Sequence, residues 1–508
     1  MKKYWIENVL PVKRRVVVAP AWKGNPEVSA LCANVELQLS SVAAEVFKDD
    51  AAAKVVATDY NSQRLIVKQY NAKNPIKFLS RTVRKSNAQK TWENAHYLLN
   101  KGVETVRPIA LIEDRIAFFR IRSFFIGIFI PGQDARAFFR DAKKTSSERR
   151  AAAEKIVDSL LALHSKNIFI GDTKDTNIVI GSDNIFWVDL EELSHPTWNW
   201  LERKKMIRDW QVLFYNWRYD DAGRKIFCDV AKSRLDRRRY WMIVRHVALY
   251  SRKKFKIDEI QSRLSVATGN ADKILAQVRQ IARGSINSDW EKVESSRSAI
   301  VARRDMDGAS LYCKVLLPRN KKEGLKRLFR AGRGERAVRN EQMMRAAGFA
   351  VPEILYWGRQ KEREYVVYRG VEGTSMIAWL NQHRHDLIEK RTVLQRFGEE
   401  VAELHLAGFA HGDLRMGNVM LRGPAESAEF VFIDNERTAL FRKIPKRLVI
   451  QNLRQINTDA VSRLSRSDRL RIFRAYQSVY GAFGKETEKR MIAEIDRLTR
   501  KRLGVASK

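Results

Sequence analysis

Two short stretches of this chain follow one pattern. Residues 411–418 read His-Gly-Asp-Leu-Arg-Met-Gly-Asn, and residues 170–177 read Ile-Gly-Asp-Thr-Lys-Asp-Thr-Asn. In each stretch an aspartate is followed five positions later by an asparagine, and the two aspartates are 413 − 172 = 241 residues apart. A single Asp-x-x-x-x-Asn arises often by chance, so the significance of the pair depends on whether the surrounding sequence repeats as well.

Three further pairs of polar residues flank the two stretches in the same order. They are Lys68 and Lys314 (246 apart), Glu93 and Glu341 (248 apart), and Asp189 and Asp434 (245 apart). An ordered series at a nearly constant spacing indicates tandem homologous domains. We place the join near residue 290, which predicts an N-terminal domain over 1–290, the more divergent of the two, and a C-terminal domain over 291–508.

The coarse secondary-structure pattern repeats in the same way. Apolar runs at 64–70 and 310–317 read as strands, and 86–99 and 336–347 have helical spacing. Helices are also expected just before each Asp-x-x-x-x-Asn stretch, and a short strand before each of Asp189 and Asp434. We therefore predict the α+β class, with two tandem domains that each have a strand-rich small lobe and a helical large lobe.

Composition limits the partners. The chain has 508 residues, 95 Lys and Arg against 59 Asp and Glu, and a net charge of +36, which favours an anionic partner. Three scattered cysteines favour a reducing compartment and argue against a disulfide framework. The longest apolar run, 124–131, is too short to span a bilayer, which needs about 20 residues. We expect a cytoplasmic protein that rests on a membrane at most.

The repeated residues are those that phosphoryl transfer requires. A lysine holds the nucleotide phosphates, a helical glutamate holds that lysine, an aspartate accepts the proton of the acceptor hydroxyl, and an asparagine with a second aspartate holds Mg²⁺, as in protein kinases. Listed in that order, the C-terminal set is Lys314, Glu341, Asp413, Asn418 and Asp434, and the N-terminal set is Lys68, Glu93, Asp172, Asn177 and Asp189.

The C-terminal copy resembles the lipopolysaccharide core sugar kinases, the Kdo/heptose kinase family with a protein-kinase-like fold. The stretches that carry the resemblance are 411–418, 432–438 and the lead-in 347–352, within about 295–480, and the N-terminal copy resembles the family more faintly over 45–250. The resemblance implies ATP- and Mg²⁺-dependent phosphorylation of a Kdo or heptose hydroxyl of the lipopolysaccharide inner core. It also implies work at the cytoplasmic face of the inner membrane, in peripheral contact with its acidic lipids.

By the same resemblance, Asp413 is the catalytic base, Asn418 and Asp434 are Mg²⁺ ligands, and Lys314 with Glu341 forms the ion pair that anchors the phosphates. The N-terminal copy has Ile170 where the C-terminal copy has His411, and neither copy has a glycine-rich loop before its lysine. The N-terminal copy is therefore either a second active site, with Asp172 as its base, or a degenerate copy kept for packing or docking.

Two other functions remain open. A kinase of another small hydroxyl compound, such as an aminoglycoside, would use the same loop chemistry, although the charge of +36 disfavours a cationic acceptor. A protein that binds nucleic acid or membranes through inactive kinase-like domains would suit the basic composition. No recognisable nucleic-acid-binding module is present in the sequence, so we expect no nucleic-acid partner.

Overall fold

The structure is a computed structural model with 51% helix and 23% strand, which confirms the predicted α+β class. It describes residues 12–71, 84–117, 119–217, 220–254, 260, 263–295, 298–306, 308–318, 331–481 and 484–504. The chain divides into two compact units. The first comprises residues 1–216 and 226–234, and the second comprises 217–225 and 235–508.

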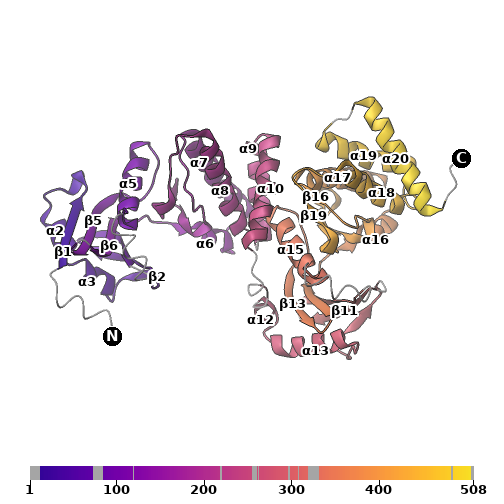
Figure 1. The fold of residues 1–508 in the computed structure, drawn as a ribbon, viewed down its shortest axis with the longest axis horizontal. Helices are drawn as coiled ribbons and strands as arrows, with labels where there is room; N and C mark the ends of the chain where they lie inside the picture. The colour runs from indigo at the N-terminus through magenta and orange to yellow at the C-terminus, as the bar shows by residue number, and fades with distance from the viewer. Residues whose placement is uncertain are drawn as a thin grey trace. The chain divides into compact units, whose positions relative to one another are not determined.

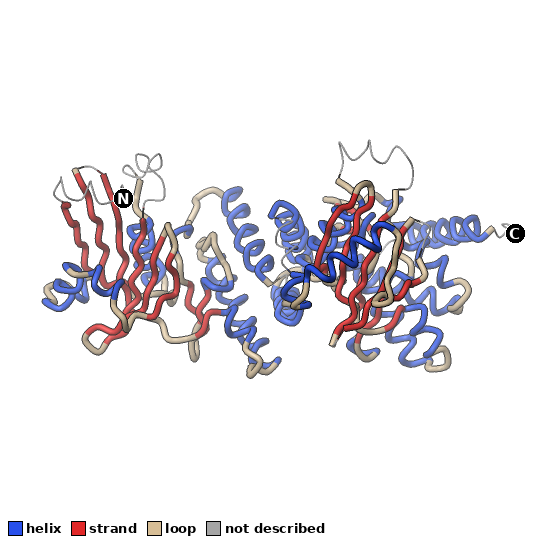
Figure 2. The backbone as a smooth tube through the Cα atoms, turned by 90° about the horizontal axis from the view of Figure 1, so that it is seen from below, coloured by secondary structure: helices blue, strands red, loops and turns tan. Residues whose placement is uncertain are grey.

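A six-stranded antiparallel sheet forms the small lobe of the first unit (Figure 2). Its order is β1-β5-β6-β4-β3-β2. The strands are β1 (Val12–Val18), β2 (Glu45–Asp49), β3 (Ala53–Tyr60), β4 (Gln63–Asn71), β5 (Pro108–Ile116) and β6 (Phe119–Ile128). Lys68 lies on β4, an interior strand, where both neighbours fix its height in the sheet.

Helices cover both faces of this sheet. On one face, α2 (Pro26–Ala33) and α3 (Val35–Ser40) share a buried core with Phe124. On the other face, α5 (Asn87–Asn100) packs against the sheet, because Ala88 in its first turn shares a buried apolar cluster with Phe125. The two phenylalanines are neighbours in sequence and serve opposite cores, because successive side chains of a strand point to opposite faces.

The large lobe of the first unit carries the Asp172 stretch. A small sheet of β7 (Gln133–Asp134), β8 (Ile178–Ile180) and β9 (Ile185–Trp187) flanks it. The helices are α6 (Ala135–Arg140), α7 (Ser146–Ser165), α8 (Asn199–Asn216) and α9 (Asp221–Arg234). The helix α7 begins with a capping box formed by Thr145 and Glu148, which stabilises its first turn. It ends just before the stretch, as the sequence predicted.

The second unit has a five-stranded antiparallel sheet of order β10-β11-β12-β14-β13 (Figures 1 and 2). The strands are β10 (Glu291–Val293), β11 (Ala299–Met306), β12 (Ala309–Leu316), β13 (Ile354–Gln360) and β14 (Arg363–Arg369). Lys314 lies on β12, between β11 and β14. Its position corresponds to that of Lys68 on β4 of the first unit.

Helices again cover both faces. The helices α12 (Arg263–Thr268) and α13 (Ala271–Arg283) share a core with Cys313. On the face that carries Lys314, α15 (Arg333–Ala346) packs against Val366. Apolar side chains recur along α13 at the spacing of an amphipathic helix. The burial of this apolar side explains why α13 stays with the second sheet.

The helical lobe of the second unit surrounds the 411–418 stretch. Its helices are α10 (Arg237–Lys254), α16 (Met376–Gln382), α17 (Leu387–Leu406), α18 (Lys446–Ala460), α19 (Arg466–Tyr480) and α20 (Lys485–Leu503). Its short strands are β15 (Thr374–Ser375), β16 (Phe409–Ala410), β17 (Val419–Arg422), β18 (Glu429–Phe432) and β19 (Ala439–Leu440). The strand β18 ends two residues before Asp434, as the sequence predicted.

The join near residue 290, with domains 1–290 and 291–508, stays a prediction from the repeat. The compact units divide near residue 234 instead, because α12 and α13 pack on the second sheet in the way that α2 and α3 pack on the first. This packing places the start of the second structural repeat ahead of Arg263. Among the described residues, no helix combines the length and apolar character that crossing a membrane requires.

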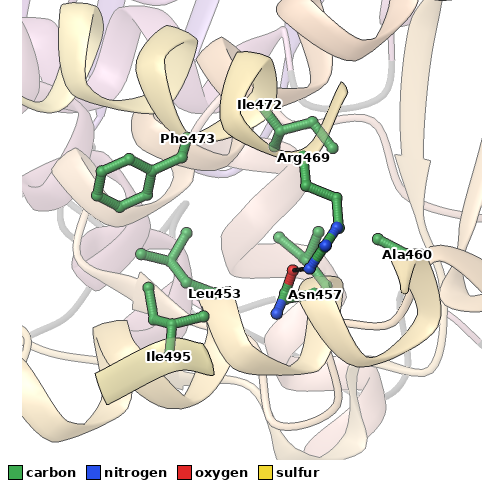
Figure 3. Close-up of a pocket in the computed structure, with 8 residues that line it drawn as sticks. Leu453, Asn457, Ala460, Arg469, Ile472, Phe473 and Ile495 are labelled. Carbon is green, nitrogen blue, oxygen red and sulfur yellow. Dashed lines mark hydrogen bonds between the residues drawn. The ribbon is translucent and has the colours of Figure 1, made fainter. Parts of the chain in front are cut away.

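A small pocket lies among α18, α19 and α20 (Figure 3). Its lining is mostly aliphatic and aromatic, and Arg469 donates a hydrogen bond to Oδ1 of Asn457 at 3.1 Å within it. None of the ten predicted site residues lines this pocket. It is a feature of helix packing in the large lobe.

The close approach of α17 and α19 depends on Gly398. A Cβ atom at this position would collide with the backbone carbonyl of Ile472 and press on Ala475. We predict that Gly398→Ala lowers the free energy of unfolding by roughly 1–3 kcal/mol, since neither helix backbone can move aside cheaply. Thermal melting followed by circular dichroism measures the loss. Gly484→Ala is the control, because nothing lies within 4 Å of a Cβ there. An unchanged melting temperature for Gly398→Ala would contradict this packing.

Candidate active site

An ion pair joins the two lobes of the second unit at the predicted site. Nζ of Lys314, from the small lobe, lies 2.7 Å from Oδ1 of Asp434, which follows β18 in the large lobe. Both side chains are partly exposed, at 21% and 35%. The two residues are far apart in the sequence, and only their predicted roles in binding phosphate and metal linked them. Their contact in the structure therefore supports a shared phosphate and metal site.

Asp434 and Asp189 share an uncommon backbone conformation. Asp434 has φ 61° and ψ 45°, and Asp189 has φ 63° and ψ 61°. Both values lie in the left-handed region, which a residue with a Cβ atom enters at a cost and keeps only where the surrounding structure holds it. In both copies a one-turn 3₁₀ helix follows the aspartate, at 435–437 and 190–192. The same strained turn therefore presents both carboxylates.

The Asp-x-x-x-x-Asn stretch of the second unit closes on itself. Nδ2 of Asn418 donates to the backbone carbonyl of Asp413 at 2.9 Å, and the backbone N–H of Ile433 donates to the carbonyl of Asn418 at 3.0 Å. Nε of Arg415 donates to Oδ1 of Asp413 at 2.9 Å. The five-residue spacing thus positions the asparagine to link the predicted base to the strand that leads to Asp434.

The first unit repeats this geometry. Nδ2 of Asn177 donates to the carbonyl of Asp172 at 3.0 Å, and the N–H of Val188 donates to the carbonyl of Asn177 at 3.0 Å. A basic side chain again reaches the aspartate, since Nζ of Lys174 lies 2.6 Å from Oδ2 of Asp172. Nζ of Lys68 lies 3.6 Å from Oδ1 of Asp189. The structure therefore brings four of the five predicted residues of the N-terminal set together.

His411 fastens the second loop in a way that Ile170 does not fasten the first. Its Nε2 donates to the carbonyl of Ile433 at 3.1 Å, and its Nδ1 accepts from the N–H of Asp413 at 3.1 Å. Burial lowers the pKa of His411, which favours the neutral ring that these two bonds require. Ile170 is fully buried and has no polar side-chain atoms, so the first loop has to be held by other groups.

A polar side chain from the following helix holds each loop. In the second unit, Oδ1 of Asn452 accepts from the N–H of His411 at 3.1 Å and from Nε2 of His405 at 3.1 Å. In the first unit, Asp209 accepts from the N–H groups of Ile170 and Gly171 at 3.1 and 2.7 Å. Neither residue is among those predicted from the sequence, although their separation of 452 − 209 = 243 matches the repeat.

Glu341 is a buried carboxylate next to the ion pair. Burial raises the pKa of Glu341 well above its usual range, while the charges of Arg345 and Lys314 oppose that shift. Its Oε2 atom has no hydrogen-bond partner. The predicted ion pair with Lys314 is not formed, because Lys314 binds Asp434 instead. A buried oxygen without a hydrogen-bond partner usually has a role, such as receiving a cation or a hydrogen-bond donor when a ligand binds.

In the first unit the predicted glutamate faces elsewhere. Oε2 of Glu93 lies 2.6 Å from Nζ of Lys85, and its side chain is 40% exposed. The two helices correspond at a spacing of 246 rather than 248, because Asn94 donates to the carbonyl of Leu190 as Asn340 donates to that of Asn435 (340 − 94 = 246). This register corrects the pairing of Glu93 with Glu341.

Ala95 is consequently the residue that stands where Glu341 stands (341 − 246 = 95), and it is fully buried. Glu93 matches Glu341 in residue type, and its spacing of 248 differs little from the 241 to 246 of the other pairs, so the sequence pattern alone favours it. On a helix two positions rotate a side chain by about 200°, so the error moves the glutamate to the opposite face.

A further pair of glutamates follows the two strained aspartates. In the second unit, Glu436 accepts from Arg333 on α15, with Nη2 2.9 Å from both carboxylate oxygens, and both residues are buried. In the first unit, Oε2 of Glu191 accepts from Nδ2 of Asn87 at 2.5 Å. Burial and the neighbouring Asp189 charge raise the pKa of Glu191 to about 7, while Lys68 and a hydrogen bond with Tyr70 oppose the rise.

The donor set suits Mg²⁺. Asn418 and Asp434 offer an amide and a carboxylate oxygen, and Mg²⁺ in kinase-type sites takes one or two such ligands with the remainder from phosphate and water. In the described part of the chain, no group of three or more His, Cys, Asp or Glu residues forms a closed metal cage. This arrangement fits an ion that arrives with a nucleotide.

Family comparisons match both halves of the chain. Residues 288–476 match the lipopolysaccharide kinase (Kdo/WaaP) family, and residues 35–209 match the lipopolysaccharide core biosynthesis protein (WaaY) family. None of the curated proteins matches the chain. The two matches cover the two copies separately, which confirms the predicted tandem repeat and the kinase-like fold of its members.

Several solved structures have a similar trace over part of the chain. WaaP in complex with acyl carrier protein is 18% identical and matches 48% of this chain and 97% of its own, with a TM-score of 0.35. The bifunctional kinase-methyltransferase WbdD is 18% identical over 40% of this chain and 47% of its own, with a TM-score of 0.27. The kinase domain of Mycobacterium tuberculosis PknI is 13% identical over 36% of this chain and 74% of its own, with a TM-score of 0.25.

The buried His405 makes the stability of the second unit depend on pH. Its Nδ1 accepts from Tyr476 at 3.0 Å and its Nε2 donates to Asn452, and burial lowers its pKa from 6.5 to about 4. Between pH 6.5 and 4, His405 binds a proton in the unfolded chain but stays neutral in the folded protein. The free energy of unfolding should therefore fall by up to about 3 kcal/mol as the pH falls from 6.5 to 4.

Urea denaturation at several pH values measures this loss, with His405→Gln as the comparison. The variant is less stable at pH 7, and its stability should change less with pH over the same window. Equal slopes for both proteins would contradict the assignment of this dependence to His405.

Proposed function

We propose that the protein phosphorylates a Kdo or heptose hydroxyl of the lipopolysaccharide inner core. The premise is that its two copies belong to the lipopolysaccharide kinase and core biosynthesis families that they match. Membership of these families makes the chain a phosphotransferase that acts on a sugar hydroxyl of the lipopolysaccharide core. The observation that supports a particular location for the active site is the contact between Lys314 and Asp434, whose Nζ and Oδ1 atoms are 2.7 Å apart. It joins the predicted phosphate-binding and metal-binding groups in one pair.

The C-terminal copy is the principal site of this proposal. ATP is the donor that kinase membership implies, and Lys314 binds its phosphates after leaving Asp434, with Glu341 fixing the position of the ammonium group. Asp434 and Asn418 would hold Mg²⁺, which would supply positive charge to the nucleotide phosphates. Asp434 pairs with Lys314 in the structure, and the metal would take the place of that cation.

Asp413 orients the acceptor sugar hydroxyl and takes its proton. Its backbone is fixed by Asn418 and His411, so its carboxylate is placed without depending on the substrate. Arg415 holds Oδ1 of Asp413, and the side chain of Arg415 is 53% exposed, so it is free to turn toward an anionic sugar or phosphate. An anionic acceptor also agrees with the net charge of +36.

The N-terminal copy is a second site in this proposal, with Asp172 as base and with Asn177 and Asp189 as metal ligands. Its support is the repeated loop geometry and the strained turn at Asp189. The acceptor is anchored in a membrane, so we further propose cytoplasmic work in peripheral contact with the acidic inner face of the inner membrane. The basic composition suits such a surface.

The purified full-length chain, ATP, Mg²⁺ and deacylated core oligosaccharide test the proposal. We predict that Asp413→Asn lowers the transfer catalysed by the C-terminal copy by about 10²–10⁴-fold, since a general base is worth roughly that much. Mass spectrometry counts the phosphates added, and fragmentation assigns them to Kdo or heptose. Asp172→Asn should remove a different phosphate from the product.

Asp386→Asn is a matched control, since Asp386 caps the first turn of α17 on the surface and asparagine caps equally well. Full phosphorylation of every position by the double variant Asp413→Asn/Asp172→Asn would refute the assignment of both bases. Phosphorylation of a sugar outside the core in place of Kdo and heptose would refute the acceptor.

A further inference from the structure

Glu191 lies at a place in the first copy where its contacts differ from those of the second copy. The helix α5 supplies no acid toward Lys68, because fully buried Ala95 stands in the place of Glu341. Glu93 is engaged with Lys85. A lysine that holds phosphates needs a fixed anionic partner, since its flexible side chain otherwise has many orientations.

The surroundings of Glu191 also differ from those of Glu436, its counterpart in the second copy. In the second copy, Arg333 neutralises Glu436 through a buried two-pronged ion pair. In the first copy the corresponding residue of α5 is Asn87 (333 − 87 = 246), which donates one neutral hydrogen bond to Glu191 at 2.5 Å. Asn87 fixes the Glu191 carboxyl group in place and, as a neutral amide, brings no positive charge to it.

The neighbouring strand supplies that cation. Lys68 and Tyr70 are two residues apart on β4, so their side chains point to the same face of the sheet. The Tyr70 hydroxyl lies 3.3 Å from the hydroxyl of Thr91 on α5. The charge of Lys68 acts on both Asp189 and Glu191. The side chain of Lys68 is only 12% exposed, and its Nζ lies 3.6 Å from Asp189.

Asp189 cannot hold both a metal ion and Lys68 at once. With Mg²⁺ on Asp189, Lys68 would need a second carboxylate. Glu191 lies two residues further along the same turn, is held by Asn87, and is within range of the charge of Lys68. We infer that Glu191 is the positioning residue for Lys68 in the first copy, in the part that Glu341 plays in the second. This inference rests on the proposed function of the first copy as a nucleotide-binding site.

The test uses the full-length chain with the second copy prevented from binding nucleotide by Lys314→Ala. ATP with Mg²⁺ is titrated calorimetrically into this parent and its variants. We expect Glu191→Gln to weaken binding about tenfold, the effect of losing an outer partner that fixes a binding group. The substituted amide can still accept the hydrogen bond from Asn87, so the melting temperature should not change. Glu93→Gln should leave the affinity within about twofold.

Restoring the helical acid separates positioning from packing. Ala95→Glu in the Glu191→Gln background should recover part of the lost affinity, which a merely structural role of Glu191 would not predict. A loss of binding in Glu93→Gln that equals or exceeds that in Glu191→Gln overturns the inference. Unchanged affinity of Glu191→Gln overturns it, and so does a melting temperature that falls together with affinity and is not restored by Ala95→Glu.

Failure of this inference is distinguishable from failure of the proposed function. If the Lys314→Ala parent binds no ATP, the first copy is not a nucleotide site and the role of Glu191 is refuted. Phosphorylation that depends on Asp413, measured with Lys314 intact, would still stand in that case. Loss of the Asp413 dependence would instead refute the main site and leave the binding measurements on the first copy unaffected.

Discussion

The arrangement of each site depends on an aspartate held in a left-handed turn opposite a strand lysine. Asp434 and Asp189 adopt nearly the same unfavourable backbone angles, and each faces the lysine of its own unit. A short strand before the turn and an asparagine of the preceding loop hold the geometry, and the helix of the small lobe adds a second asparagine bond. The strain is kept because several elements converge on these residues, which is typical of a binding site.

The two copies keep this arrangement while exchanging the groups around it. His411 and Asn452 in the second unit are replaced by Ile170 and Asp209 in the first. Asp209 accepts from two backbone N–H groups, which offsets the loss of the histidine. Such exchanges preserve the positions of the catalytic backbone and change the electrostatics, so the two copies can differ in affinity and acceptor without differing in fold.

Buried carboxylates carry the electrostatic differences. Glu341 is buried with an unpaired oxygen, whereas Glu436 is neutralised by Arg333. In the first unit the helical acid is absent and Glu191 is held by a neutral amide. Because an unneutralised buried carboxylate is costly, each is expected to lie where a cation or proton compensates it. The acids near the lysines therefore differ between the two units in position and in the groups that compensate them.

The sequence by itself determined the repeat, the strand–helix order and the loop residues that converge, because fixed spacing in a loop between regular elements is a local property. It also placed Lys68 and Lys314 on strands, since an apolar run is local as well, whereas the strand pairing of the tertiary structure made those strands interior. Only the tertiary structure decided the helix register that removes Glu93 from the site, because a two-residue shift barely alters the residue pattern but turns a side chain to the opposite face. The partners Asn452, Asp209 and Glu191, and the packing of α13 on the second sheet, depend on contacts between distant segments, which no local pattern records.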